Sequence, residues 1–173
     1  MGRFWTRSLA AGAASLAMLA GGAPVATAQP STGPSCSVNP GDPAATVNDL
    51  RFGCSAAEYD ALYRALGPGT VPQNVTAQGF VKGNPVAELV WQGKAFGTGT
   101  VTNRMVGLEV FPASVRVGPS YADGAPAILI DYSGGPLGFI RDEIRQVQPG
   151  VYMGFAYDQS GAPRVAERFI LVL

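Results

Sequence analysis

The chain of 173 residues carries twelve basic and twelve acidic side chains, and it contains no histidine. This balance of charge gives no field that would attract nucleic acid. The absence of histidine excludes Ser-His-Asp and Cys-His catalysis as well as histidine-ligated metal sites. Because no phosphate-loop or dinucleotide-binding motif is present either, we expect no cofactor and no metal.

The first 28 residues have the features of a secretory signal peptide. Arg3 and Arg7 form a basic start, the stretch 9–19 is small and apolar, and residues 26–28 match a cleavage site. The apolar stretch is shorter than the ~20 residues that a membrane-spanning helix needs. We therefore expect cleavage after Ala28, a secreted or extracytoplasmic location, and no membrane span in the mature chain. Its ten basic and twelve acidic residues leave a net charge of −2.

Residues 29–54 are expected to form an irregular lead-in to the domain, because the segment 29–43 is rich in Pro, Ser, Thr and Gly. Cys36 and Cys54 are the two cysteines of the chain, and an exported pair is expected to form a disulfide. This bond would tether the lead-in to the domain. In the chain-entropy model it would stabilise the fold by about 3 kcal/mol.

The sequence Ser55-Ala56-Ala57-Glu58 is a capping box, which predicts the start of one N-terminal α-helix. The helix would run to about Leu66, where Gly67 and Pro68 end it. Its apolar stripe must pack on another element, and one end of a barrel is a natural partner. The stripe consists of Leu62, Leu66 and either Tyr59 or Tyr63.

From residue 70 onward the chain consists of short apolar runs separated by Gly, Asn, Asp and Pro, which is typical of antiparallel strands. The pattern predicts a single mainly β domain over residues 55–173, as an antiparallel up-and-down barrel or a sandwich. Either arrangement would include the N-terminal helix. The segment 85–96 is ambiguous and leaves room for a short helix before the next strand. The predicted strands are 78–82, 100–108, 111–117, 127–132, 139–147, 151–157 and 164–172.

The predicted strand 139–147 holds four charged residues within five positions. Alternation puts Arg141, Glu143 and Arg145 on one face and Asp142 on the other, together with the isoleucines. If the Arg141-Glu143-Arg145 row faces water, it is an ordinary solvated strand face. If it faces the lumen, the guanidinium groups need partners, and Asp131 on the preceding strand would supply one. Because charge rows usually face water, we favour the solvated or structural interpretation.

Two smaller groups are candidates for a site. In an enzyme, Asp131 or Glu143 would act as the general base, and a developing oxyanion would be stabilised by Arg141, Arg145 or Tyr132. The simpler interpretation of Asp131 is a strand-end acid paired with an arginine. Trp91 and Phe96 flank Lys94, which could line a ligand pocket and supply a charge or a Schiff-base amine. Such aromatic residues more often belong to the core, with the lysine reaching the surface.

Three motifs, taken in order, resemble a family of bacterial proteins named for a Gly-x-Trp-x-Gly motif, together with their companion domain of unknown function. The segment 79–83 keeps both glycines but has Val81 in place of tryptophan. The segment 91–96 is similar to the family's Trp-x-Gly-Lys-x-Phe block, and 140–145 fits its Ile-x-Asp-x-(Phe or Ile)-Arg pattern. The resemblance spans about 79–173. It implies a calycin- or lipocalin-like up-and-down barrel, which we therefore favour over a sandwich. This fold commonly encloses a small ligand, and the resemblance implies no established catalytic activity.

The sequence therefore predicts a secreted bacterial β-barrel protein that binds a small, largely apolar or lipid-like ligand. One alternative is a structural or interaction module of the cell envelope, which predicts a filled barrel. The other is a carboxylate-dependent isomerase- or cyclase-type enzyme with Asp131, Glu143 and Arg145 in the cavity. Nothing in the sequence specifies an oligomeric state. The candidate ligand-binding residues are Trp91, Lys94, Phe96, Tyr132, Arg141, Glu143 and Arg145.

Overall fold

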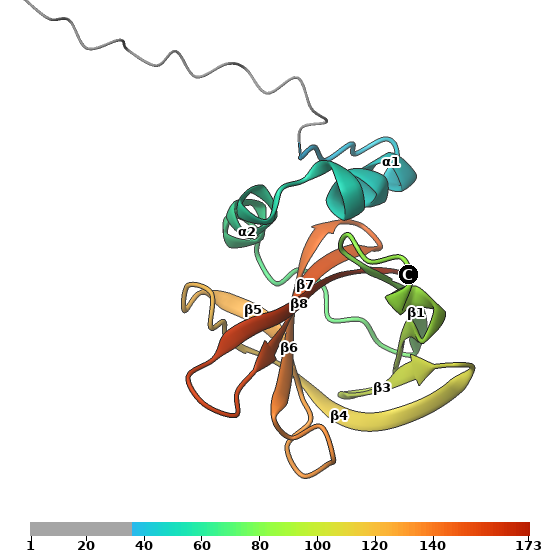
Figure 1. Ribbon diagram of the computed structural model, residues 1–173, viewed down its shortest axis with the longest axis vertical. Helices are drawn as coiled ribbons and strands as arrows, with labels where there is room; N and C mark the ends of the chain where they lie inside the picture. The colour runs from blue at the N-terminus through green and yellow to red at the C-terminus, as the bar shows by residue number, and fades with distance from the viewer. Residues whose placement is uncertain (1–35) are drawn as a thin grey trace, which may run out of the picture. The chain divides into compact units, whose positions relative to one another are not determined.

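The computed structural model describes residues 36–173, so the predicted signal peptide lies outside the described part of the chain. Eight antiparallel strands form one closed barrel, in which each strand pairs with the next and β8 pairs with β1 (Figure 1). This confirms the predicted up-and-down barrel. The strands are β1 (Val75–Val81), β2 (Trp91–Phe96), β3 (Thr100–Met105), β4 (Leu108–Pro119), β5 (Pro126–Asp131), β6 (Ile140–Gln148), β7 (Val151–Asp158) and β8 (Arg164–Val172).

The middle of the chain resolves one ambiguity of the sequence and corrects one predicted strand. The ambiguous segment 85–96 holds a short 3-10 helix, η2 (Ala87–Leu89), followed at once by β2. The predicted strand 100–108 is divided into β3, which covers residues 100–105, and the first residue of β4. Val106 and Gly107 between them both have positive φ, 44° and 82°, which is the backbone of a two-residue hairpin turn.

The lead-in is more ordered than its composition suggests. Residues 43–53 are helical, as α1 (Pro43–Asn48) and a π-helical turn, η1 (Asp49–Gly53). The Asp42 side chain caps α1 by accepting a hydrogen bond from the Ala45 N–H at 2.9 Å, and proline fits the first turn because its missing N–H is not needed there. The predicted disulfide between Cys36 and Cys54 is present and closes this segment.

The helix α2 (Ala56–Ala65) begins at the predicted capping box. The Glu58 N–H donates to the Ser55 hydroxyl at 3.2 Å, and the Ser55 N–H donates to the Glu58 carboxylate at 2.8 Å. Tyr59 and Tyr63 are both fully buried, so both belong to the apolar stripe. They pack against the outward-facing side chains of β7 and β8, so α2 covers the barrel wall rather than one of its ends (Figure 1). Among residues 36–173 we find no helix long and apolar enough to cross a membrane.

One end of the barrel interior is filled by side chains. There, inward-facing apolar side chains from every strand pack into a continuous core, including Phe96, Val101, Ile128, Ile144, Tyr152 and Leu171. These positions lie where β2 and β8 end and where β3, β5 and β7 begin. The opposite end of the barrel contains the cavity described next.

Candidate functional site

A cavity of about 300 Å³ occupies the open end of the barrel. Its volume lies at the lower end of the range for small-molecule sites. It reaches the surface at Glu167, which is exposed at the start of β8. Most of its wall is apolar, from Val81, Met105, Leu137, Ile140, Ala156 and Phe169.

The floor of the cavity is polar and is organised around Lys94. This side chain is 1% exposed, and its ammonium group donates to the Asp142 carboxylate at 2.6 Å. It also donates to the Tyr132 hydroxyl at 2.6 Å and to the Asn103 amide oxygen at 2.9 Å. All three ammonium protons are therefore used. Lys94 lies on β2, Asn103 on β3 and Asp142 on β6, and Tyr132 directly follows β5; only the closed barrel brings the four together.

Two further contacts fix the orientation of the floor. The Trp91 indole N–H donates to the Asn103 side-chain oxygen at 3.0 Å, and the Asn103 amide N–H donates to the Tyr132 hydroxyl at 2.9 Å. Because Trp91 and Lys94 can only donate, the amide oxygen of Asn103 must face them. Burial, reinforced by the charge of Asp142, raises the pKa of Tyr132 well above its ordinary value. The phenol therefore stays neutral and donates to Asp142 at 2.9 Å.

Two motif glycines give Trp91 its position at the cavity. A Cβ atom at Gly79 would lie 2.5 Å from the Trp91 ring, so only glycine leaves room for the indole. Gly93 has φ of +118°, and a Cβ atom there would lie 2.2 Å from the Ala77 carbonyl oxygen. On its other side, β2 shifts register against β3 between Trp91 and Gly93. A side chain at either glycine would displace the indole or separate the strands.

The structure brings together three of the predicted ligand-binding residues, because Trp91, Lys94 and Tyr132 all line the cavity. Phe96 lies farther along β2, in the core of the filled end. Sequence reasoning missed Asp142 and Asn103 as site residues. For Asp142 a signal existed, since alternation places this acid on the apolar inward face of its strand. Asn103 carried no comparable signal.

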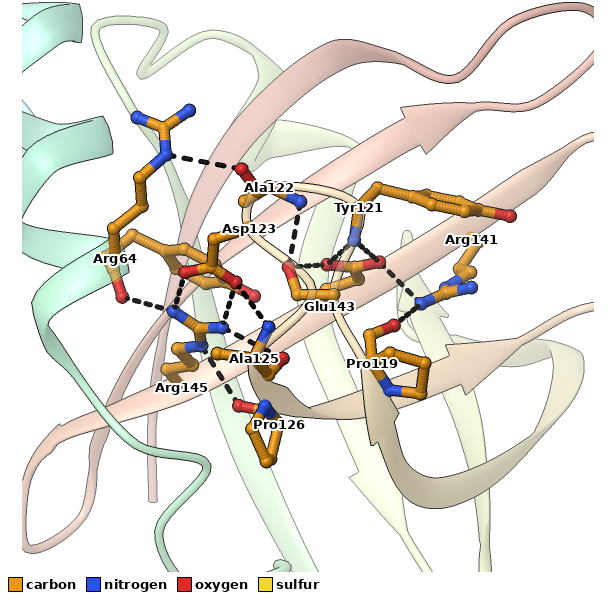
Figure 2. Close-up of polar contacts among 12 residues, drawn as sticks. Arg64, Pro119, Tyr121, Ala122, Asp123, Ala125, Pro126, Arg141, Glu143 and Arg145 are labelled. Carbon is orange, nitrogen blue, oxygen red and sulfur yellow. Dashed lines mark hydrogen bonds and ion pairs between the residues drawn. The ribbon is translucent and has the colours of Figure 1, made fainter.

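The Arg141-Glu143-Arg145 row faces neither solvent nor lumen. All three residues are buried, with at most 9% of their surface exposed, yet their side chains project from the outer face of β6 (Figure 2). The connection between β4 and β5 covers them: the Glu143 carboxylate accepts hydrogen bonds from the Ser120 hydroxyl and from the Tyr121 N–H at 3.0 Å. Arg141 completes this group with an ion pair to Glu143 at 2.7 Å. The alternative in which this row faces the lumen is therefore not the arrangement found, and none of the three residues lines the cavity.

Arg145 joins three parts of the molecule (Figure 2). It forms a two-pronged ion pair with Asp123, at 2.7 and 2.8 Å, which lowers the pKa of that carboxyl group. Its remaining N–H groups donate to the carbonyl oxygens of Tyr63 on α2 at 3.0 Å, and of Ala125 and Pro126 at 3.1 and 3.2 Å. Every N–H of the guanidinium group thus has a partner. The partner expected from the sequence, Asp131, is not among them.

Asp131 lies on the outer face of β5. Its carboxylate accepts a hydrogen bond from the Ser133 N–H at 2.9 Å and lies 3.9 Å from the exposed Arg116 guanidinium. The hydrogen bond to Ser133 lowers the pKa of Asp131, which is opposite to what a general base requires. Asp131 and Glu143 both lie outside the barrel, so neither of these two carboxylates lines the cavity.

Comparisons with known proteins bear on the fold only. No protein-family model and no curated protein matches the chain. A crystal structure of a protein from Thermomonospora curvata superposes with a TM-score of 0.52 and 18% sequence identity. The match covers 74% of this chain and 93% of the other. The likeness supports the barrel fold.

Proposed function

We propose that this chain is an exported barrel protein that binds a small, largely apolar molecule in the open end of the barrel. The observation that carries the proposal is the cavity of about 300 Å³, whose apolar wall ends at the buried Lys94–Asp142 pair. An apolar pocket with a few convergent polar groups is the usual form of a small-molecule site. The apolar wall would hold the body of the ligand, and the floor would orient its polar end.

The energetics of the floor favour a binding role over a structural one. Replacing a buried ion pair by apolar side chains of similar size is often neutral or stabilising. Stability is therefore a weak reason for Lys94 and Asp142 to occupy the inside of a barrel. A polar group of a ligand gives a better reason, because it would meet groups that are already oriented.

Export is part of the proposal and has two supports. The first 28 residues have the pattern of a signal peptide. The Cys36–Cys54 disulfide is typical of proteins that leave the reducing cytoplasm.

We also propose that the chain is related to the Gly-x-Trp-x-Gly proteins and their companion domain. Residues from separate motifs meet in the cavity: Trp91 and Lys94 belong to the second motif and Asp142 to the third. Val81, which stands where the first motif has tryptophan, also lines the cavity. The smaller side chain would leave room for a ligand.

The alternative of an interaction module without a ligand predicted a filled barrel, and the open end argues against it. Titration with the neutral fluorescent probe N-phenylnaphthylamine tests the binding function. We expect saturable binding that is lost in Ala156→Phe, because Ala156 lines the cavity beside Asp142. The matched control, Ala166→Phe, adds the same ring at an exposed position of β8 and should bind normally.

Equal binding by the two variants would contradict the proposal. A second measurement identifies natural ligands: the protein is incubated with a lipid extract, repurified, and the retained molecules are analysed by mass spectrometry. We expect retained molecules in the wild type and in Ala166→Phe, and none in Ala156→Phe.

A further inference from the structure

The hydrogen bonds of the cavity floor leave two groups unused, and these indicate what the floor can bind. The Lys94 ammonium has no proton to spare, and the Tyr132 hydroxyl already donates once and accepts twice. By contrast, both hydrogen bonds that Asp142 accepts from residues 36–173 end on Oδ2. The Asp142 side chain is 7% exposed, and Oδ1, which accepts no hydrogen bond from these residues, is not fully buried. This oxygen is therefore available to a ligand.

The second unused group is on Asn103. Its side-chain oxygen accepts from Lys94 and Trp91, and one of its two amide protons goes to Tyr132. One proton remains. The floor thus offers one acceptor, on Asp142, and one donor, on Asn103, and both flank the same Tyr132 hydroxyl. A hydroxyl group, which both donates and accepts, matches this pair.

The charges around the cavity also favour a neutral polar group on the ligand. The Lys94 ammonium is neutralised by Asp142 at 2.6 Å, and Glu167 adds a negative charge at the exposed rim. A carboxylate ligand would face Asp142 without a free ammonium proton to receive it, which is unfavourable in a partly dry site. A protonated amine would approach Asp142 only beside the Lys94 ammonium, where the like charges repel.

We propose that the polar end of the bound molecule is a neutral hydroxyl group, held between Asp142 Oδ1 and the Asn103 amide, and that the cavity rejects carboxylates of the same length. The inference rests on the binding function proposed above and adds the chemical class of the ligand.

Competition against N-phenylnaphthylamine, with the full chain at about pH 8, tests the inference, because a fatty acid is ionised there. The competitors are octanol, octanoate, octylamine and methyl heptyl ether, which have similar lengths and differ in the head group. Octanol should bind at least about tenfold more tightly than each of the others, because each of those leaves a floor group unpaired or adds a repelled charge. Octanoate, octylamine or the ether binding as tightly as octanol would overturn the inference while leaving the binding function intact.

A variant ties the preference to the named residues. The double substitution Lys94→Met with Asp142→Leu replaces the ion pair by apolar side chains of similar size, so the barrel should fold. Octanol and methyl heptyl ether should then bind equally well. An undiminished preference for octanol in this variant would contradict the assignment. Failure of the wild type to bind the probe or any competitor would instead overturn the binding function and, with it, the hydroxyl assignment.

Discussion

The two faces of β6 carry buried charges of the same kind, in different surroundings. On the outer face, Glu143 and Arg145 lie under the β4–β5 connection and α2, with every guanidinium N–H of Arg145 bonded to protein (Figure 2). On the inner face, Asp142 pairs with Lys94 beside an open cavity and keeps one oxygen unused. Burial alone therefore does not distinguish a structural charge cluster from a binding site. A binding site is distinguished by hydrogen-bonding groups that have no partner in the protein and lie beside an open cavity.

The largest effect is expected on the outer face. Arg145→Ala should lower the free energy of unfolding by about 3 kcal/mol, because it removes a buried ion pair and leaves three carbonyl oxygens with fewer partners. The folded variant should still bind N-phenylnaphthylamine. Urea unfolding followed by circular dichroism, with probe titration in the absence of urea, measures both.

The control for this prediction is Arg164→Ala, which removes an ion pair to Asp158 at the surface, where the arginine side chain is 76% exposed. This substitution should lower the free energy of unfolding by less than about 1 kcal/mol. If Arg145→Ala lowered the free energy of unfolding no more than this control, the contacts of Arg145 would not stabilise the fold as we expect.

A smaller loss of stability is expected on the inner face. Lys94→Met leaves the Asp142 carboxylate without its cation and should lower the free energy of unfolding by about 2 kcal/mol. The loss is smaller than for Arg145→Ala because the nearby cavity gives this carboxylate some access to water. Adding Asp142→Leu should restore most of the stability, because the unpaired charge is then gone. Chemical denaturation of the single and double variants tests this pair. A double variant no more stable than the single one would show that the pair itself supports the fold.

The smallest effect concerns pH and Asp123. The hydrogen bonds from Arg145 lower the pKa of Asp123 in the folded state. The ionised Asp123 therefore stabilises the fold fully at a pH above its pKa in the unfolded chain. This stabilisation is lost as the pH falls through its pKa in the folded protein. Wild type should be more stable than Asp123→Asn near neutral pH. The difference should shrink between about pH 5 and about pH 1. Urea midpoints measured across this range test the prediction, and a difference that does not change with pH would contradict it.

Local patterns in the sequence predicted most of the barrel, because strand alternation and turn residues act over a few positions. The same is true of α2, whose capping box lies within four residues. The helix α1 was missed although Asp42 and Pro43 form a start signal, because the surrounding Pro- and Gly-rich composition suggested an irregular segment.

The site was harder to predict because it depends on closure of the barrel. Lys94 and Asp142 are 48 positions apart and meet only across the lumen. Alternation placed Asp142 on the inward face, but nothing local linked it to Lys94 or to Asn103. The buried outer row was also missed, because coverage of a strand face by a distant connection leaves no periodic pattern in the strand itself.

A crystal structure of the protein soaked with octanol tests the central claim most directly. We expect octanol in the barrel cavity, with its chain against Phe169 and Trp91 and its hydroxyl within hydrogen-bond distance of Asp142 Oδ1. The outer Arg141-Glu143-Arg145 row should be unchanged. Octanol bound against that outer row, with the cavity free of it, would contradict the account.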